Sequence, residues 1–439
     1  MYTQDYFKNK KITVMGLGLL GRGVGDIKFL AEEGAELIVT DLKSEIELKA
    51  SVDALKAFPT ITFMLGEHRL EDFQNRDFIL KAAGVPLDSI YIEEARKNNI
   101  PIEMSASLFA ALTPATLIGI TGTRGKSTVT HLLYDVLKEA YKEKFVRIFL
   151  GGNVKGVSTL SFLREAKKGD IAVLELDSWQ LQGFGERKIS PHIAVFTNFL
   201  NDHLNYYKGD MEKYFDDKAN IFLYQKQNDY LITGPTVGHL ITAKHFQNLA
   251  QHPIALSGEI VPKDWSVQLS GQHNLDNIAL VIRVANIVGV PYEVTRKVVE
   301  EFKGVPGRLE LIREYKGIKI YNDTTATTPD ATIVALKALE TNIILIAGGA
   351  DKQLDMSKLV EEIPKHTKAV VWLAGTGTEK IKGDALVYDT LKKAVDKAFE
   401  IAQPGDSVLL SPAFASYGMF INEFDRGDQF VKIVESLPS

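Results

Sequence analysis

The chain has 439 residues, more than one hydrophobic core normally serves, so we expect two or three domains of about 100–200 residues each. A content of 45% hydrophobic and 24% charged residues is typical of a soluble globular protein, and no run approaches the ~18 apolar residues of a membrane-spanning helix. A net charge of -5 without a basic tract argues against nucleic acid as the main ligand, and the lack of cysteine excludes a disulfide framework, a thiolate zinc site and a cysteine nucleophile.

The N-terminus leads into the first predicted strand without a long apolar region, so we expect a cytoplasmic protein. Short apolar runs then alternate with amphipathic stretches, which predicts an α/β fold of parallel sheets covered by helices. The predicted strands are residues 12–17, 36–41, 117–121, 171–176, 193–197, 343–347, 369–373 and 407–410. The predicted helices are residues 127–142, 211–226, 275–288, 330–339 and 391–401.

A glycine-rich loop, GLGLLG at residues 16–21, follows the first strand, and Asp41 ends the next strand. This spacing is that of a dinucleotide-binding fingerprint. By itself it fits an NAD site, a site for another phosphate-bearing ligand, or glycines that only permit close strand–helix packing. An NAD-dependent oxidoreductase therefore stays open at this point.

The strand at 117–121 leads into the segment Gly122-Thr123-Arg124-Gly125-Lys126-Ser127-Thr128, which opens a long helix. Backbone N–H groups of such a turn face phosphate oxygens, Lys126 reaches the β/γ-phosphates, and the hydroxyl of Ser127 or Thr128 can hold Mg²⁺. The strict phosphate-loop spacing would place its first glycine at Ile120, but the strand–loop–helix context favours ATP binding over a simple connection.

Polar residues end two further strands of the middle region. Glu175 could hold the Mg²⁺ of a nucleotide, or else cap a helix or face solvent. Asn198, Asp202 and His203 follow the strand at 193–197, and a lone histidine is as often structural as catalytic. Lys218 lies within a predicted helix, and this context alone predicts a solvated surface charge.

Asn274 and Asn277 are spaced by three at the start of a helix, so both lie on one face and could read a base edge. N-capping alone explains Asn274 equally well. A turn-rich stretch at residues 304–307 then precedes a probable hairpin of strands at 309–314 and 318–322. We therefore predict three domains, at residues 1–104, 105–304 and 305–439.

The ordered motifs resemble those of the Mur ligase family of peptidoglycan synthesis, over essentially the whole chain. They are GLGLLG at 16–21, AAGVPLD at 82–88, ITGTRGKST at 120–128, GGN at 151–153, ELDSWQL at 175–181, NDH at 201–203, GQHNLDN at 271–277, GVPGRLE at 304–310, NDTTATTP at 322–329, GGADK at 348–352, SPAFAS at 411–416 and RG at 426–427.

The resemblance implies a three-domain ATP-dependent ligase that activates a carboxylate as an acyl phosphate. The N-terminal Rossmann-like domain would bind the UDP of the substrate, the central P-loop domain would be the ATPase, and the C-terminal dinucleotide-fold domain would bring in the amino acid and close over ATP. The substrates would be UDP-N-acetylmuramoyl-L-alanine (UDP-MurNAc-L-Ala) and an amino acid, D-glutamate being favoured. We expect a monomer that binds neither nucleic acid nor membrane.

The resemblance also assigns roles to individual residues. Those expected to bind UDP are Gly18, Leu19, Leu20 and Asp41, and those expected to bind ATP are Gly122, Thr123, Gly125, Lys126, Ser127, Thr128, Asn274, Asn277, Arg308 and Asp323. Ser127 and Glu175 would hold one Mg²⁺, and His203 with a carbamylated Lys218 would hold a second. Asn153 would contact the activated substrate. The residues expected to line the amino-acid site are Thr327, Lys352 and Ser416.

Some positions depart from the family pattern. Arg124 stands where Asn or His is usual, Ala82-Ala83 replace a Ser-Pro pair, Thr325 replaces a lysine, and Glu423 lies near a usually aromatic position. Loss of a cation and gain of an anion predict relaxed selection of D-glutamate. The alternatives are a Mur-like ligase for L-glutamate, lysine or another carboxylate acceptor such as a folate, and a non-catalytic Mur-like binding protein.

Overall fold

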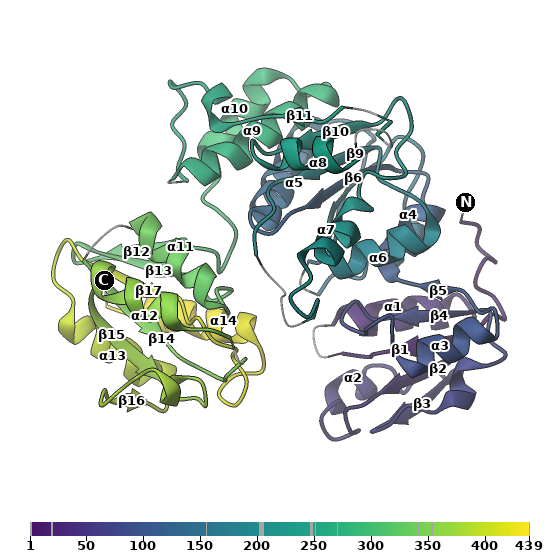
Figure 1. The fold of residues 1–439 in the computed structure, drawn as a ribbon, viewed down its shortest axis with the longest axis horizontal. Coiled ribbons are helices and arrows are strands. Elements are labelled where there is room, and N and C mark those ends of the chain that lie inside the picture. Colours follow the sequence, from purple (N-terminus) through teal and green to yellow (C-terminus); the bar gives the residue numbers. More distant parts are fainter. Residues whose placement is uncertain are drawn as a thin grey trace. The chain divides into compact units, whose positions relative to one another are not determined.

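The computed structural model describes residues 2–18, 21–154, 156–201, 206–245, 249–250, 252–269, 271–339, 342–352 and 354–438. They form two compact units, one of Met1–Ser266 with Gln272–Glu300 and one of Val267–Gly271 with Glu301–Ser439. Three mainly parallel sheets lie in these units, two in the first and one in the second (Figure 1). The predicted α/β fold class is confirmed, whereas domain limits at residues 104 and 304 stay a prediction.

The first sheet is parallel and has the order β3-β2-β1-β4-β5. Its strands are β1 (Lys11–Met15), β2 (Glu36–Asp41), β3 (Ile61–Leu65), β4 (Phe78–Lys81) and β5 (Ile102–Glu103), and its helices are α1 (Arg22–Glu32), α2 (Lys49–Asp53) and α3 (Ile90–Lys97), with the short 3₁₀ helix η1 (Leu70–Phe73). The chain runs outward from β1 to β3 and then returns to β4 on the other side of β1. Ligands of open α/β sheets bind at such a reversal, so the loops after β1 and β4 flank a natural binding site.

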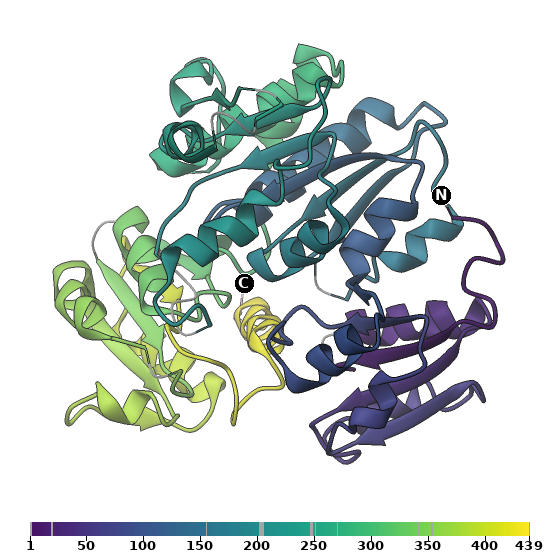
Figure 2. The ribbon, with the colours of Figure 1, turned by 45° about the vertical axis from the view of Figure 1, so that its right-hand side comes forward.

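The second sheet is parallel, with the order β11-β10-β9-β6-β8-β7. Its strands are β6 (Thr116–Thr121), β7 (Ile148–Gly152), β8 (Ile171–Glu175), β9 (Ile193–Phe196), β10 (Tyr230–Thr233) and β11 (Ile254–Ala255). The helices of this part are α4 (Ser105–Leu112), α5 (Lys126–Tyr141), η2 (Leu160–Arg164), α6 (Ser178–Arg187), α7 (Met211–Ala219), α8 (Val237–His245), η4 (Gly258–Ile260), α9 (Gln272–Ile287) and α10 (Tyr292–Glu301). Every residue of β8 and β9 is buried because helices flank the sheet, and a parallel strand covered on both faces is apolar throughout (Figure 2).

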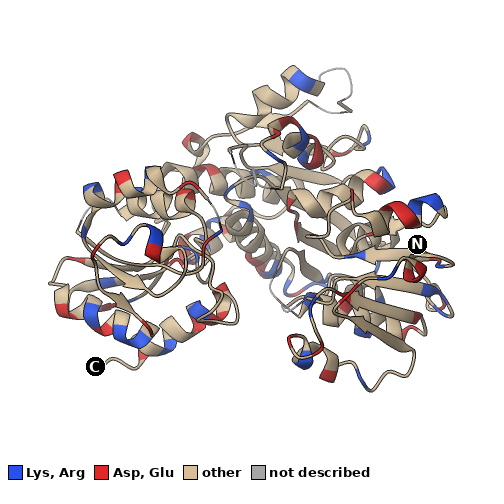
Figure 3. Cartoon of the chain, turned by 60° about the horizontal axis from the view of Figure 1, so that its bottom comes forward, with Lys and Arg blue, Asp and Glu red and all other residues tan. Residues whose placement is uncertain are grey.

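The sheet of the second unit has the order β12-β13-β17-β14-β15-β16. Its strands are β12 (Glu310–Tyr315), β13 (Ile318–Asn322), β14 (Ile343–Ala347), β15 (Thr367–Leu373), β16 (Val387–Tyr388) and β17 (Ser407–Leu410), and its helices are α11 (Pro329–Leu339), α12 (Ser357–His366), η5 (Thr378–Lys380), α13 (Leu391–Ile401) and α14 (Glu423–Glu435). The predicted hairpin is confirmed, since β12 pairs with β13 antiparallel and the other pairs are parallel. Acidic and basic residues are interspersed along the helices (Figure 3).

The helix predicted at residues 211–226 is wrong in length, because α7 ends at Ala219. Turns replace its second half, and Gln225 lies among them with its side-chain amide donating to the carbonyls of Pro191 and Tyr230. The hydrogen bond to Pro191, 34 positions away, helps to hold a turn conformation that the amphipathic pattern does not reveal. In the described part of the chain, no helix is long and apolar enough to cross a membrane.

Candidate active site

The loop between β6 and α5 is built on glycines at which a side chain would be strained and in close contact with neighbouring atoms. Gly122 has a φ of 144°, and a Cβ there would lie 1.9 Å from the Thr197 hydroxyl oxygen. Gly125, at a φ of 81°, precedes the first residue of α5, so the loop faces the N-terminus of a 16-residue helix. The Lys126 ammonium donates to the carbonyls of Gly122 (2.9 Å) and Thr123 (3.1 Å). This arrangement is that of an anion-binding loop with its own cation.

The segment after β9 braces this loop. The Arg124 N–H donates to the Asn198 side-chain oxygen (2.9 Å), and the Asn198 amide group donates back to the Arg124 carbonyl (3.2 Å). The Thr197 hydroxyl donates to the same carbonyl at 2.5 Å. The family departure Arg124 is therefore accommodated through its backbone. Asn198 positions the loop, whereas Asp202 and His203 lie outside the described residues.

Glu175 and Asn153 lie together beside the loop, at the ends of neighbouring strands. Glu175 is the last residue of β8 and only 2% exposed, and Asp177 caps the following helix, so neither the capping nor the solvated interpretation of Glu175 is correct. The Asn153 N–H donates to the Glu175 carbonyl at 2.7 Å. Gly152 makes this approach possible, because a Cβ there would lie 2.1 Å from the same oxygen.

Lys218 is not the surface charge that its helical context suggests. It is 1% exposed, and its ammonium donates to the Gly122 carbonyl (2.9 Å) and the Thr121 hydroxyl (3.5 Å). The ring centroid of Tyr214 lies 4.9 Å from the same nitrogen. Lys126 also donates to the Gly122 carbonyl, so two cationic side chains meet at one backbone oxygen of the loop.

The amide pair of α9 contacts the loop from another side. Asn277 is 5% exposed, and a Cβ on Gly125 would lie 2.3 Å from its side-chain oxygen. Its amide nitrogen lies 3.4 Å from the Asn274 side-chain oxygen. Asn274 is the third residue of α9, so the N-cap interpretation is wrong. Ser127, 5% exposed, and the half-buried Thr128 occupy the first turn of α5.

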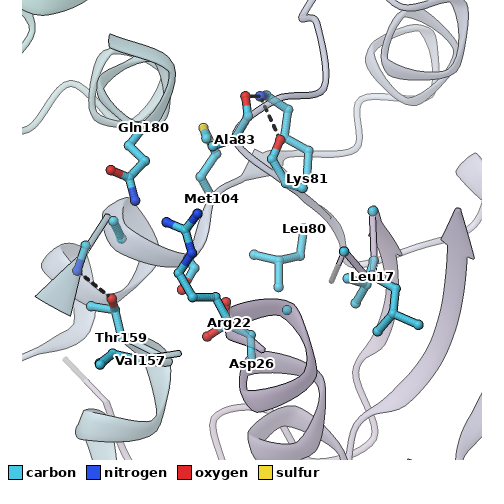
Figure 4. Close-up of a pocket in the computed structure, with 18 residues that line it drawn as sticks. Leu17, Arg22, Asp26, Leu80, Lys81, Ala83, Met104, Val157, Thr159 and Gln180 are labelled. Carbon is cyan, nitrogen blue, oxygen red and sulfur yellow. Dashed lines mark hydrogen bonds between the residues drawn. The ribbon is translucent and has the colours of Figure 1, made fainter. Parts of the chain in front are cut away.

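A cavity of about 190 Å³ lies at the strand reversal of the first sheet (Figure 4). Its walls come from Gly16, Leu17, Gly18, Arg22, Asp26, Lys81, Met104, Thr159, Gln180 and neighbouring residues of both sheets of the first unit. The Asp41 carboxylate shapes the glycine-rich loop, because one oxygen accepts the N–H groups of Leu17 (2.9 Å) and Gly18 (3.2 Å). Leu19 and Leu20, predicted to contact UDP, lie outside the described residues.

Lys81 is a cavity residue that the sequence interpretation missed. It is 2% exposed, and its ammonium donates to the carbonyls of Ala82 (3.3 Å), Ala83 (3.4 Å) and Val85 (2.8 Å). Burial lowers the pKa of Lys81 to about 8. Lys81 thus anchors the loop in which Ala82-Ala83 replace the family's Ser-Pro. The only sequence feature that could have identified it is a lysine directly after the apolar residues of β4.

Asp26 makes the stability of the first unit depend on pH. Burial raises its pKa to about 6, although the Ser158 hydroxyl donates to it at 2.6 Å. The folded state therefore holds this proton more tightly than the unfolded chain, and stability is lost as pH rises from about 4 to 6. Asp26→Asn should remove a penalty of roughly 3 kcal/mol at pH 8 and change little below pH 4.

The measurement is the thermal unfolding midpoint of both proteins between pH 4 and 8. Asp5→Asn, at an exposed carboxylate, is the matched control and should shift no midpoint by more than a degree or so. A lower midpoint of Asp26→Asn at pH 8 would contradict the burial argument.

In the second unit, Asp323 organises the turn that carries Arg308. One carboxylate oxygen accepts the Leu309 N–H (3.0 Å) and the other the Ser411 hydroxyl (2.8 Å). Leu309 has a φ of 47°, and this hydrogen bond helps to hold that left-handed conformation. Arg308, which precedes it, is exposed.

The three predicted amino-acid-site residues come together where β13, β17 and β14 end. The Lys352 ammonium donates to the Thr327 hydroxyl at 2.9 Å. Ala350 and Ala415 pair through two backbone hydrogen bonds of 2.9 and 3.2 Å, which holds the Ser416 segment beside that of Lys352. Ser416 is 3% exposed.

A buried arginine donates hydrogen bonds to the loops that contain Thr324 and Phe414. Arg426, which is fully buried in α14, donates to the Thr324 carbonyl (2.8 Å), the Thr324 hydroxyl (3.1 Å) and the Phe414 carbonyl (3.4 Å). Burial lowers its pKa to about 10, and Glu423 and Asp323 oppose that change. The Thr325 hydroxyl donates to the Gly307 carbonyl (2.9 Å). The region around Glu423 and Thr325 thus contains a cation, Arg426, to which the sequence interpretation gave no role.

Comparison with known proteins gives three consecutive matches along the chain. Residues 10–103 match the MurD-like N-terminal domain of Mur ligases, residues 120–244 the Mur ligase middle domain, and residues 307–414 the glutamate ligase domain of Mur ligases. Each matched segment covers most of one of the three sheets.

Curated relatives extend the similarity over nearly the whole chain. The UDP-N-acetylmuramoylalanine–D-glutamate ligase of Roseiflexus sp. (strain RS-1) is 40% identical, over 97% of this chain and 98% of the relative. The ligase of the same name from Borreliella afzelii (strain PKo) is 37% identical over 99% of both chains.

Two solved structures share the fold at 19% identity and a TM-score of 0.58. They are the UDP-N-acetylmuramate–alanine ligase MurC of Thermotoga maritima, over 98% of this chain and all of that one, and the MurF ligase of the same organism in complex with ADP, over 99% and 96%. Sequence matches along nearly the whole length, together with the architecture that carries the loop and strand-end residues, show that the chain belongs to the Mur ligase family.

Proposed function

We propose that this ATP-dependent ligase of peptidoglycan precursor synthesis adds D-glutamate to UDP-MurNAc-L-Ala through an acyl phosphate. The observation that carries the proposal is the convergence of Lys126 and Lys218 on the Gly122 carbonyl, with Glu175 and Asn153 at the next strand ends. Relatives at 40% and 37% identity bear the name of this activity. An NAD-dependent oxidoreductase would leave the phosphate loop unexplained.

The first chemical step joins a substrate carboxylate to the γ-phosphoryl group of ATP and releases ADP. Lys126, at the N-terminus of α5, would neutralise charge on the transferring group, and Asn277 against Gly125 would help to hold the nucleotide. The amine of the amino acid then attacks the acyl carbon, the amide forms, and phosphate leaves. Arg308 and Asp323 would contact ATP from the second unit.

The donor set of the central site suits Mg²⁺, a hard cation that prefers oxygen ligands. Ser127 and Glu175 would hold one ion, and His203 and a carbamylated Lys218 a second. When bound, Mg²⁺ would neutralise charge on the phosphoryl oxygens.

Carbamylation of Lys218 also resolves a charge conflict in the loop. As an ammonium, Lys218 shares the Gly122 carbonyl with the Lys126 ammonium. A carbamate replaces this like-charge pair with an opposite-charge pair, and it supplies oxygen ligands where a buried cation would repel a metal ion.

In the second unit, Lys352, Thr327 and Ser416 would bind the amino acid, the lysine pairing with a carboxylate. The direct test is phosphate release from ATP and UDP-MurNAc-L-Ala with a panel of amino acids. We expect D-glutamate to give the highest kcat/KM. Equal release with every amino acid, or none with any, would contradict the proposal. The monomeric state and the cytoplasmic location stay predictions.

Thr325→Lys should sharpen the choice of amino acid. A lysine restores a cation near the amino-acid site, so kcat/KM for D-glutamate should rise about tenfold, equivalent to roughly 1.4 kcal/mol, relative to D- and L-lysine. Thr325→Met, which adds length without charge, is the matched control. The prediction would be contradicted if wild type already selects D-glutamate strongly and Thr325→Lys does not raise kcat/KM. In that case Lys352 and the buried Arg426 supply the positive charge that D-glutamate needs.

A further inference from the structure

Helix α1 is fastened to the segment that follows β7 at three points along its length. Its first residue, Arg22, donates from Nη1 to the Asn153 side-chain oxygen (2.7 Å). Asp26 accepts from the Ser158 hydroxyl, and Glu32 at the last turn pairs with Arg164. Only the first of these contacts reaches a residue assigned to the reaction.

The Arg22 contact determines which way the Asn153 amide faces. An asparagine amide has one accepting oxygen and one donating NH₂ group, and the two ends can exchange by rotation. Arginine has donors only, so the oxygen must face Arg22 and the NH₂ group must face away from it. A neutral residue at position 22 would leave both orientations available.

The position of Asn153 gives this orientation a chemical consequence. Its N–H bonds the carbonyl of Glu175, so its backbone lies at the strand end next to the central site, and its side-chain oxygen accepts from Arg22 there. Arg22 itself rises from α1 into the cavity (Figure 4). A fixed NH₂ donor is suited to an acceptor oxygen that becomes more negative when the carboxylate is phosphorylated and attacked.

We propose that Arg22 is a positioning residue that presents the Asn153 NH₂ group to the reacting carboxyl group of the acceptor. The inference rests on the proposed role of Asn153. Arg22 thereby links the first sheet, which would bind the UDP portion, to the chemistry at the second.

The test is a double-mutant cycle of Arg22→Met and Asn153→Ala with kcat, KM and the calorimetric Kd for UDP-MurNAc-L-Ala. We expect Arg22→Met to lower kcat about tenfold or more with less than a threefold change in Kd. Because Arg22 acts through Asn153, the double variant should be no slower than Asn153→Ala alone. Arg22→Lys retains a donor and should recover part of kcat.

Arg164→Met is the matched control, since it removes the other arginine contact of α1 without touching Asn153. It should keep kcat within about twofold. The proposal would be overturned if the kcat losses of the two single variants multiply in the double variant, or if Arg164→Met loses as much kcat as Arg22→Met. Arg22 would then act only by holding α1 against the segment that follows β7. A large rise in Kd for UDP alone in Arg22→Met would overturn it in favour of a direct diphosphate contact. An impaired Asn153→Ala beside a fully active Arg22→Met would overturn this inference alone, whereas a fully active Asn153→Ala would overturn the assigned role of Asn153 as well.

Discussion

Lys126→Ala is expected to abolish Mg²⁺-dependent ATP turnover while leaving the Kd for UDP-MurNAc-L-Ala nearly unchanged. The Lys126 ammonium belongs to the loop at the end of β6, whereas the cavity at the first sheet is lined by other residues. A cation that meets the transferring phosphoryl group stabilises the transition state more than the ground state, so its loss should cost about 10³-fold or more in kcat.

The measurement is steady-state phosphate release together with calorimetric binding of UDP-MurNAc-L-Ala. Lys138→Ala is the matched control, because Lys138 is an exposed lysine of the same helix α5. It should leave both quantities within about twofold. If Lys126→Ala lost ATP turnover and UDP-MurNAc-L-Ala binding together, the proposal that the second sheet serves ATP and the first sheet the UDP substrate would be refuted.

Lys218→Ala should lose activity by about 10²-fold or more, and added formate or acetate should restore part of it. Lys218 is buried against the Gly122 carbonyl, so alanine leaves a space beside the phosphate loop. A short carboxylate can enter that space and supply the anionic oxygens that the carbamate would provide.

Lys213→Ala, at an exposed position of α7, is the control and should be neither impaired nor activated by the carboxylates. Mass measurement of the intact protein under CO₂ would show an added carbamate in wild type but not in Lys218→Ala. If Lys218→Ala were fully active without added carboxylate, the proposal that a Lys218 carbamate takes part in the reaction would be wrong.

Continuous apolar runs predicted the strands well. The predicted limits of β2, β14 and β17 agree with the structure, because each is a short apolar run whose ends are marked by polar or turn residues. Parallel strands bring their carboxyl ends to one edge, so Glu175 and the phosphate loop could be assigned to one site from order alone. Ser416 and Lys352, by contrast, were grouped by the family resemblance.

The buried cations could not be predicted from the residues alone. Whether Lys218, Lys81 or Arg426 faces solvent depends on segments distant in sequence, or on the path of a loop, and helical or strand periodicity carries no such information. For Lys218 the family resemblance supplied what periodicity did not. The orientation of Asn153 likewise depends on Arg22, which lies 131 positions away.

The hydrogen bonds of Arg426 affect the order in which the protein matures. Because α14 follows Thr324 and Phe414 in the chain, the loops at these two residues lack their internal support until α14 has been synthesised. Domains fold as units while the chain emerges, so the sheet that carries the phosphate loop can form before these loops of the second unit are supported. A chain that ends before Arg426 would thus keep the residues of the phosphate loop but lack the hydrogen bonds that hold the loops at Thr324 and Phe414.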